Sequence, residues 1–348
     1  MTGAPPPAAL VGYAREADPL LREFLARKGR DLEGLPVDLR PVHEALTDYV
    51  LRGGKRVRGA LAILGCEAAG AKAELARNAS LGLELLHAYL LIHDDFMDGD
   101  ELRRGGPTLH VSLGKRSAHL GDSLAVLAGS LCEAWAVELL LSSPVEAERT
   151  LRAAKLLSTA LQSVILGQSL DLCAPFEPPL DDGGVARLQA LKTGSYTFEL
   201  PLRIGAVLGG ASAGVLEVLE RFARPLGIAF QIADDLLGTL GSSEVTGKPS
   251  GSDLREGKRT LLVARALRMA TPQDAALLRE SLGRRDLPES GVEAAREVLI
   301  RSGAATSCRE EADRLLRQAL AALDGAPVPE PVARTLREIA AYTVRRES

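Results

Sequence analysis

Prolines divide this chain of 348 residues into long windows, and their spacing limits the folds that the chain can adopt. Five windows contain no proline: residues 42–106, 108–143, 145–174, 202–224 and 226–248. Because a proline inside a helix costs about 3 kcal/mol, windows of this length permit long helices. Alanine, leucine, arginine and glutamate dominate the composition, and they lose little rotamer freedom in a helix. Since we find no alternating strand pattern, the sequence predicts an all-α fold.

Three local signals predict where helices begin. Two have the S-x-x-E pattern of a capping box, and the third places a threonine before a proline at the first helical position. These signals are Ser143 with Glu146, Ser290 with Glu293, and Thr271 with Pro272. We find no internal repeat and no interdomain linker. We therefore expect a partly flexible N-terminal arm over residues 1–35 and a single helical domain over residues 36–348.

Charge and cysteine spacing exclude several classes of protein. A formal net charge of −4 lacks the basic field of a general nucleic-acid binder. The cysteines Cys66, Cys132, Cys173 and Cys308 form no C-x-x-C pair, so we expect buried packing residues rather than a zinc or disulfide framework. The N-terminus lacks a secretory signal pattern, and the apolar run 123–141 contains two glutamates, which favours a buried helix over a membrane span. We expect a cytoplasmic protein.

An acidic cluster follows an apolar run and suggests a metal site. The window 85–110 passes from apolar residues into five carboxylates: Asp94, Asp95, Asp98, Asp100 and Glu101. On a helix, Asp94 and Asp98 share one face, where like charges repel unless a cation lies between them. Oxygen ligands suit Mg²⁺ or Mn²⁺, and Mg²⁺ commonly completes its coordination with substrate phosphates. The alternative is a solvated helix end.

A second acidic pair, Asp234 and Asp235, also ends an apolar run. We call Asp94–Asp98 the first acidic motif and Asp234–Gly238 the second. If the two faced each other across a helical bundle, they would hold more than one ion. Four cations accompany them in sequence and suit a phosphorylated substrate: Arg103, Arg104, Lys248 and Lys258. The alternative is two unrelated surface clusters.

Two glycine-rich basic segments remain. The segment around Lys248 and Lys258 has five residues where a nucleotide-binding P-loop needs four, and neither lysine precedes Ser or Thr, so we reject a P-loop. The segment Arg52–Arg58, here called the basic loop, offers four cations around two glycines, which suits an anion that needs no metal. An ordinary solvated loop is the alternative.

Six segments in combination resemble the all-trans polyprenyl diphosphate synthases. They are GGKRVRG, HDDFMDGDELRRGGPTLH, LGQSLDL, KTGSYTFE, QIADDLLG and VTGKPSGSDLREGKRT. The resemblance covers about residues 40–346. It implies an isoprenoid synthase-type helical bundle with a central cavity, in a homodimer. It also implies that the two motifs face each other and bind three Mg²⁺ around an allylic diphosphate.

The resemblance assigns roles to individual residues. It implies that Asp94, Asp98 and Asp234 bind metal, with Asp95 and Asp235 in support. It implies that the allylic diphosphate is held by Arg103, Lys192, Thr193, Gln231, Lys248 and Lys258. It implies that isopentenyl diphosphate is held by Lys55, Arg58, His87 and Arg104. It implies that the cavity is lined by Gln168 and Asp171 and covered by a basic tail, Arg345–Arg346. His93 is expected to be structural.

The implied reaction joins isopentenyl diphosphate to an allylic diphosphate. The allylic carbon–oxygen bond breaks, the double bond of isopentenyl diphosphate attacks the cation, and the departing diphosphate takes the proton. Tyr89 lies five residues before Asp94, roughly 7.5 Å deeper along a helix. By resemblance, a bulky residue there stops growth at geranylgeranyl diphosphate, with farnesyl diphosphate as the alternative. Tyr89 as an ordinary core aromatic is the other interpretation.

One position departs from the family pattern, and three other functions compete. Gly238 stands where the second motif commonly ends in aspartate, which puts the metal stoichiometry in question. A class I terpene cyclase would need no basic loop and would carry a different second motif. A noncatalytic partner subunit would lose motif residues, whereas the first motif is complete. A metal phosphohydrolase would need more histidines than the five present.

Overall fold

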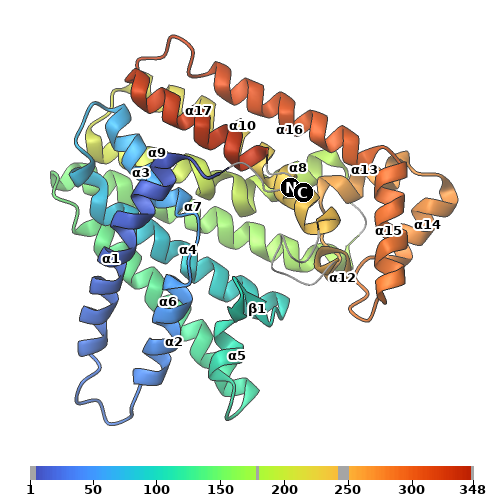
Figure 1. Ribbon diagram of the computed structural model, residues 1–348, viewed down its shortest axis with the longest axis horizontal. Coiled ribbons are helices and arrows are strands. Elements are labelled where there is room, and N and C mark those ends of the chain that lie inside the picture. The colour runs from blue at the N-terminus through green and yellow to red at the C-terminus, as the bar shows by residue number, and fades with distance from the viewer. Residues whose placement is uncertain (1–4, 178–179, 242–250, 346–348) are drawn as a thin grey trace. The chain divides into compact units, whose positions relative to one another are not determined.

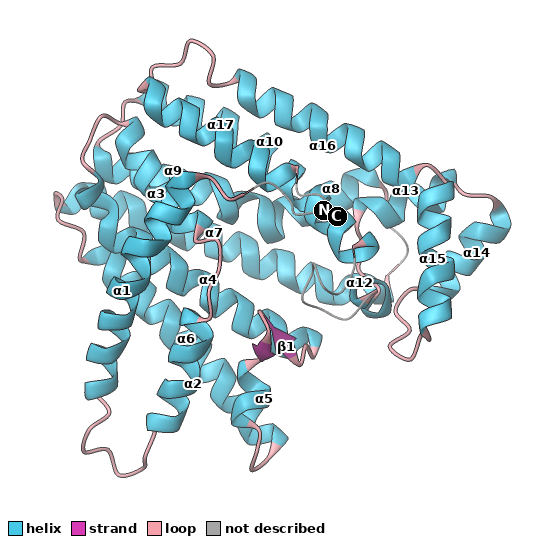
Figure 2. Cartoon of the chain, in the orientation of Figure 1, coloured by secondary structure: helices cyan, strands magenta, loops and turns pink. Residues whose placement is uncertain are grey.

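The computed structural model describes residues 5–177, 180–241 and 251–345, without the side chains of residues 193–195. Helices dominate these ranges, and the strands described there form one short antiparallel hairpin (Figure 2). The prediction of an all-α fold is confirmed.

The chain groups into two compact units. The N-terminal unit consists of Pro6–Ala154 and Ile204–Ala211, and the C-terminal unit contains Lys155–Arg203 and the described part of Ser212–Ser348. Two helices run from one unit into the other: α7 (Ala147–Cys173) and α9 (Leu200–Gly209).

The N-terminal unit is centred on a long helix pair (Figure 1). Its elements are α1 (Ala8–Arg30), α2 (Arg40–Leu51), α3 (Val57–Ala68), the 3₁₀ helix η1 (Ala73–Ala76), α4 (Arg77–Asp98), β1 (Leu102–Arg103), β2 (Gly106–Pro107), α5 (Leu109–Leu113) and α6 (Ala118–Leu141). The most extensive packing is between α4 and α6. At Gly82, a Cβ would lie 2.7 Å from the carbonyl oxygen of Ala136, so a glycine is required for this close approach.

The first 35 residues contain a 23-residue helix, α1, which packs within the N-terminal unit. Its inner face buries Leu10, Leu21 and Leu25. The hydroxyl of Tyr13 donates a hydrogen bond to Ser80 Oγ at 3.0 Å. Both apolar and polar contacts therefore hold α1 against the helices that follow it.

The C-terminal unit is built around α10. Its elements are η2 (Ala174–Phe176), α8 (Asp182–Gln189), η3 (Ala190–Glu199), α10 (Ala213–Leu240), α12 (Ser252–Glu256), α13 (Leu261–Met269), α14 (Pro272–Ser281), α15 (Glu289–Arg301), α16 (Ala304–Ala321) and α17 (Glu330–Val344). The helix α10 packs chiefly on α16 and η3. The element η3 is a π-helix, a rare conformation that is frequent at functional sites.

One of the three predicted helix starts is confirmed. Thr271 caps α14, because its side chain accepts a hydrogen bond from Asp274 N, and Pro272 occupies the first turn. The other two are wrong. The N-cap of α15 is Pro288 rather than Ser290, and α7 begins at Ala147 while the buried Ser143 Oγ has no hydrogen-bond partner.

Three of the four cysteines are buried, as the sequence predicts: Cys66, Cys132 and Cys308. Burial raises the pKa of the Cys66 thiol to about 11 and that of Cys132 to about 12. Cys173 is exposed at the end of α7, so the prediction is wrong there.

Exposed leucines follow one side of α6. Leu120, Leu127, Leu131 and Leu141 are each at least 40% exposed, and their spacing places them on one stripe of the helix. By length and composition, α6 and the segment Ala147–Phe176 could each cross a membrane, although core helices pass the same test. In α6, 44% of the most apolar window is buried inside the protein.

Candidate active site

The first acidic motif forms the last turn of α4, which ends where Gly99 adopts a left-handed conformation (φ 74°). Asp95 is fully buried, and the Tyr49 hydroxyl donates to its Oδ2 at 2.6 Å. Arg103 Nε donates to Asp95 Oδ1 at 2.6 Å. Burial raises the pKa of Asp95, while Arg103 opposes the rise. Asp94 and Asp98 are partly exposed, so the motif has one buried carboxylate and two accessible ones.

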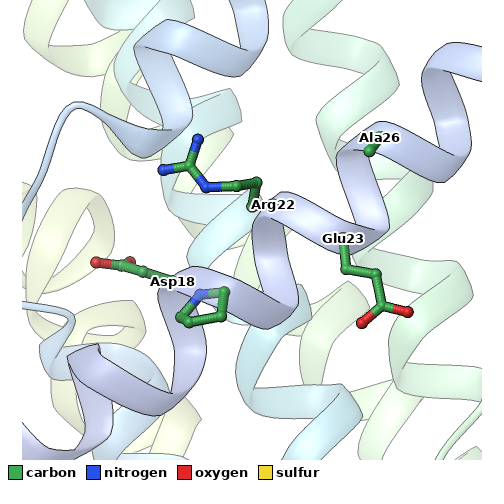
Figure 3. Close-up of a pocket in the computed structure, with 5 residues that line it drawn as sticks. Asp18, Arg22, Glu23 and Ala26 are labelled. Atoms are coloured by element: carbon green, nitrogen blue, oxygen red, sulfur yellow. The ribbon is translucent and has the colours of Figure 1, made fainter.

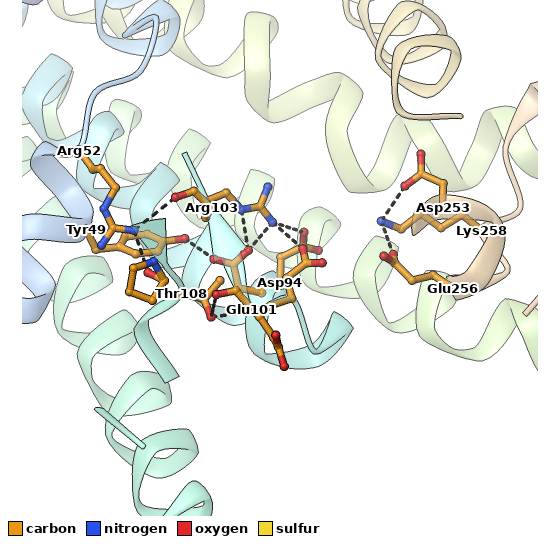
Figure 4. A network of polar contacts seen from close by, with 12 residues as sticks. Tyr49, Arg52, Asp94, Glu101, Arg103, Thr108, Asp253, Glu256 and Lys258 are labelled. Carbon is orange, nitrogen blue, oxygen red and sulfur yellow. Dashed lines mark hydrogen bonds and ion pairs between the residues drawn. The ribbon is translucent and has the colours of Figure 1, made fainter. Parts of the chain in front are cut away.

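A tight hairpin presents the two arginines that follow this motif. Its strands pair Arg103 with Gly106, leaving Arg104 (φ 51°) and Gly105 (φ 72°) as the turn. Positive φ angles at both central residues are those of a type I′ turn, and the two arginines beside and within it bond to different partners. Arg103 turns to the carboxylates, where its Nη2 also donates to Asp100 Oδ2 at 3.0 Å (Figure 4).

Arg104 turns instead to the basic loop. Its Nη1 donates to the carbonyl oxygen of Gly53 at 2.6 Å. His87, on α4, has a pKa well below its usual range because it is buried and because Arg58 and Arg104 repel its charged form. The structure thus brings three of the four residues assigned to isopentenyl diphosphate together. Lys55 is exposed within the same basic loop.

The second acidic motif lies near the end of α10. Asp235 is buried, and both of its oxygens accept hydrogen bonds from amides: Gln189 Nε2 at 2.6 Å and Gln231 Nε2 at 2.7 Å. Burial raises the pKa of Asp235 well above its usual range, and nearby carboxylates add to the rise. Asp234 is exposed. Gln231, which the sequence assigns to the allylic diphosphate, here holds Asp235.

Gly238 lies against the following short helix, α12. A Cβ at position 238 would come within 2.5 Å of Asp253 Oδ2, so Asp253 fills the space into which a larger residue would project. Lys258 lies 3.5 Å from Asp253 Oδ1 and 2.7 Å from Glu256 Oε2 (Figure 4). This part of the chain therefore pairs the predicted phosphate-binding lysine with carboxylates.

Lys192 and Asp171 come together within the C-terminal unit. Lys192 Nζ lies 2.5 Å from Asp171 Oδ2, and a Cβ at Gly167 would lie 2.4 Å from the Lys192 backbone nitrogen. Glycine thus lets α7 approach η3 closely. Arg345 follows the last turn of α17. Three assigned features lie outside the described residues or side chains: the side chain of Thr193, Lys248, and Arg346.

Tyr89 is 7% exposed in the N-terminal unit. Its ring packs edge-on against His93 on the same helix, with centroids 4.6 Å apart. Burial raises the pKa of Tyr89, and Glu133 on α6 adds to the rise. His93 lies 3.0 Å from the carbonyl oxygen of Val126, in agreement with its expected structural role. The chain-length role of Tyr89 stays a prediction.

Sequence reasoning missed three residues that organise the site: Tyr49, Arg52 and Gln189. Tyr49 and Gln189 each lie 46 residues before the aspartate that they contact, so no local pattern links them. In the sequence, Arg52 is one of four cations in the basic loop, and nothing in its charge distinguishes it from the other three. Its position directly before two glycines was the available signal.

A shallow pocket elsewhere in the N-terminal unit is lined by none of the residues assigned to metal or diphosphate binding (Figure 3). Its lining comes from one side of α1: Asp18, Pro19, Arg22, Glu23 and Ala26. Asp18 Oδ1 accepts a hydrogen bond from Arg56 Nε at 2.9 Å. We therefore take the first acidic motif with the basic loop as the candidate site of the N-terminal unit, and the second acidic motif as that of the C-terminal unit.

In each motif taken by itself, the accessible carboxylates suit magnesium. Asp94 and Asp98 are partly exposed and Asp234 is exposed, and their carboxylates are the hard oxygen ligands that Mg²⁺ prefers. By contrast, the oxygens of the buried Asp95 and Asp235 accept hydrogen bonds from protein donors. The first motif therefore contains two accessible carboxylates and the second contains one, each beside a buried carboxylate that the protein itself holds.

The chain is similar to known isoprenoid diphosphate synthases. The family described as polyprenyl synthetase matches residues 40–299. A geranylgeranyl diphosphate synthase of Saccharolobus solfataricus is 31% identical over 313 residues, 89% of this chain and 91% of that protein. A (2E,6E)-farnesyl diphosphate synthase of Mycobacterium bovis is 34% identical over 302 residues, covering 85% and 80%. The crystal structure of a Corynebacterium glutamicum geranylgeranyl pyrophosphate synthase, complexed with isoprenyl diphosphate and magnesium, matches with a TM-score of 0.92 at 31% identity, covering 96% and 99%.

Proposed function

The chain belongs to the polyprenyl synthetase family, and we propose that it is a short-chain trans-prenyltransferase that makes geranylgeranyl diphosphate. One observation supports the proposal most directly: of the two adjacent hairpin arginines, Arg103 bonds to the first acidic motif and Arg104 bonds to the basic loop. Two candidate anion sites therefore lie side by side within one unit, one beside the carboxylates of the first acidic motif and one at the cations of the basic loop. A reaction that joins two diphosphates needs both kinds of site, whereas a terpene cyclase needs only the first.

We assign the metal-dependent site to the allylic substrate. In this proposal Asp94, Asp98 and Asp234 hold three Mg²⁺, which neutralise charge on the leaving diphosphate. The two acidic motifs then act together within a single functional domain over residues 36–348. Arg103, Lys192 and Lys258 bind the allylic diphosphate after exchanging their carboxylate partners for phosphate oxygens. Thr193, Gln231 and Lys248 complete this set.

We assign the basic loop and its neighbours to isopentenyl diphosphate. Lys55, Arg58 and Arg104 supply charge, and the neutral imidazole of His87 supplies a hydrogen bond. This arrangement holds the double bond of isopentenyl diphosphate near the allylic cation as the carbon–oxygen bond breaks. The departing diphosphate takes the proton, and closure by the C-terminal tail excludes water that would trap the cation.

Product length is the finer part of the proposal. Tyr89 lies one and a half turns before Asp94, and its ring would block a tail growing along α4. The similarity to a geranylgeranyl diphosphate synthase over 89% of the chain supports the twenty-carbon product. Farnesyl diphosphate is the second candidate, because a farnesyl diphosphate synthase is 34% identical to the chain. Tyr89→Ala should lengthen the products, and an unchanged product distribution would remove Tyr89 from the argument.

We also propose a cytoplasmic homodimer without a membrane span. The exposed leucine stripe on α6 supports a second copy of the chain as a partner, since contiguous apolar surface is costly in water. Sedimentation of the purified chain at several concentrations tests this proposal. A monomer at all concentrations would contradict it.

The reaction is tested by incubating the purified chain with Mg²⁺, radiolabelled isopentenyl diphosphate and each allylic primer in turn. We expect elongation that chelation abolishes, with a twenty-carbon main product. Elongation with no primer would defeat the synthase proposal. In that case, cyclised products from an allylic diphosphate alone would favour a cyclase, and activity restored by a second prenyl synthase would favour a noncatalytic subunit.

A further inference from the structure

The end of α2 contacts the hairpin that carries Arg103 and Arg104. Arg52 Nη1 donates to the carbonyl oxygen of Pro107 at 2.7 Å and to that of Arg103 at 3.3 Å. These carbonyls belong to opposite strands, so a single guanidinium joins both strands of the hairpin. In Figure 4, Arg52, which directly follows α2, reaches the hairpin, while the Tyr49 hydroxyl donates to Asp95 on α4.

The carbonyl of Arg103 belongs to the peptide that links it to Arg104. The orientation of this peptide decides where both side chains go, because Arg104 follows it in a left-handed conformation (φ 51°). That conformation favours glycine or asparagine, and an arginine keeps it only when surrounding contacts fix it. Arg52 supplies such a contact at the peptide itself.

Arg52 is itself held in place. Asp48 Oδ2, one turn earlier, accepts from its Nε at 3.2 Å and from its Nη2 at 2.5 Å. Its guanidinium also lies over the Tyr49 ring, 5.8 Å from the centroid. A Cβ at Gly106 would come within 2.6 Å of Arg52 Cζ, so glycine at this strand position leaves room for the guanidinium.

We propose that Arg52 is a positioning residue that orients Arg103 and Arg104 together, and so prepares the sites for both diphosphates. This inference rests on the proposed function for its substrates. Tyr49 provides an internal comparison, since the hydrogen bond described for its hydroxyl goes to Asp95 of the first acidic motif. Loss of Arg52 should therefore affect both substrates, and loss of the Tyr49 hydroxyl chiefly the allylic one.

The test compares steady-state kinetics of the full chain and its variants. Arg52→Gln should raise the KM for both the allylic diphosphate and isopentenyl diphosphate by about tenfold, the loss expected for a charge-assisted contact. Arg52→Lys keeps the charge but loses the planar fork, so it should move both KM values in the same direction. Tyr49→Phe should raise the allylic KM alone. Arg40→Gln is the matched control, since Arg40 begins the same helix and pairs with the exposed Asp38.

Gly106→Ala tests the same contact without touching Arg52. The added methyl group should displace the guanidinium and reproduce the effect of Arg52→Gln. In the double variant the two changes should add little to each other, because both remove one interaction. Additive effects would overturn the inference. This variant also keeps the test available if Arg52→Gln folds poorly.

Binding of inorganic pyrophosphate in EDTA, measured by calorimetry, gives a readout that needs no turnover. Arg52→Gln should bind it about tenfold more weakly than the wild type, and Arg40→Gln equally well. Unchanged pyrophosphate binding together with unchanged KM values would overturn the inference. A fall in kcat alone, with both KM values constant, would indicate a general structural role and would also overturn it. If the wild type elongates no primer, the proposed function fails, yet the pyrophosphate comparison still decides the role of Arg52.

Discussion

Both acidic motifs begin with an accessible aspartate followed by a buried one. They differ in the groups that donate hydrogen bonds to the buried aspartate. In each, a buried aspartate accepts hydrogen bonds at both oxygens, while the aspartate before it is accessible. Asp95 is held by a tyrosine and by the cation Arg103, whereas Asp235 is held by two neutral amides. Burial raises the pKa of both aspartates, well above the usual range at Asp235, where the Gln231 amide opposes the rise, while Arg103 opposes it at Asp95. Among the hydrogen bonds of the described residues, the buried aspartate of the first motif thus accepts from a proposed phosphate-binding cation, and that of the second accepts from two neutral amides.

The largest expected effect comes from neutralising each buried aspartate. Asp95→Asn leaves Arg103 without its buried counter-charge, so we expect the free energy of unfolding to fall by about 2–3 kcal/mol. Asp235→Asn removes a charge that burial already disfavours, so we expect a change below about 1 kcal/mol. Urea denaturation of both variants measures the difference. Equal losses of unfolding free energy in the two variants would show that Arg103 does not make the first motif more sensitive than the second.

A smaller effect is expected from completing the second motif. Gly238→Asp would place a second carboxylate against Asp253, and we expect overpacking and repulsion to cost about 1–2 kcal/mol despite the better helix propensity. Adding Asp253→Ala should restore most of that loss. Thermal denaturation of the single and double variants provides the measurement, with Asp253→Ala alone as the control. If Gly238→Asp is as stable as the wild type, Gly238 does not make room for Asp253.

The sequence predicted the ends of α4 and α10 as sites because both combine an apolar run with carboxylates, a pattern readable within one window. It could not predict the groups that hold those carboxylates. Tyr49 and Gln189 are joined to their aspartates by tertiary packing across 46 residues, which leaves no periodicity in the sequence. The family resemblance supplied the residue roles, but it did not mark these supporting contacts.

Backbone conformation was the other source of error. Proline was treated as a boundary, yet α10 continues through Pro225, because packing along a 28-residue helix can offset one lost hydrogen bond. The hairpin was missed because a type I′ turn favours asparagine, while this one carries Arg104. The S-x-x-E pattern at Ser290 is followed by a helix that already begins at Glu289. In each case tertiary context prevailed over a local preference.

The smallest predicted effect extends the comparison to the cations beside the first motif. His87 has a lowered pKa in the folded chain because of burial and then of Arg58 and Arg104, whereas the unfolded chain binds a proton near pH 6.5. The unfolded state therefore binds more protons as the pH falls below 6.5, and stability is lost in that range. We expect His87 to account for about 1 kcal/mol of this loss between pH 6.5 and 5.5. Urea denaturation at both pH values should show a shallower dependence for His87→Gln than for the wild type. His43→Gln is the control, since His43 lies on α2 beside Thr47 and Trp135, away from the basic loop. Parallel curves for His87→Gln and the wild type would mean that the folded chain does not disfavour the charged imidazole. The contrast between the motifs would then rest on Arg103, which bonds to Asp95, against the two amides that bond to Asp235.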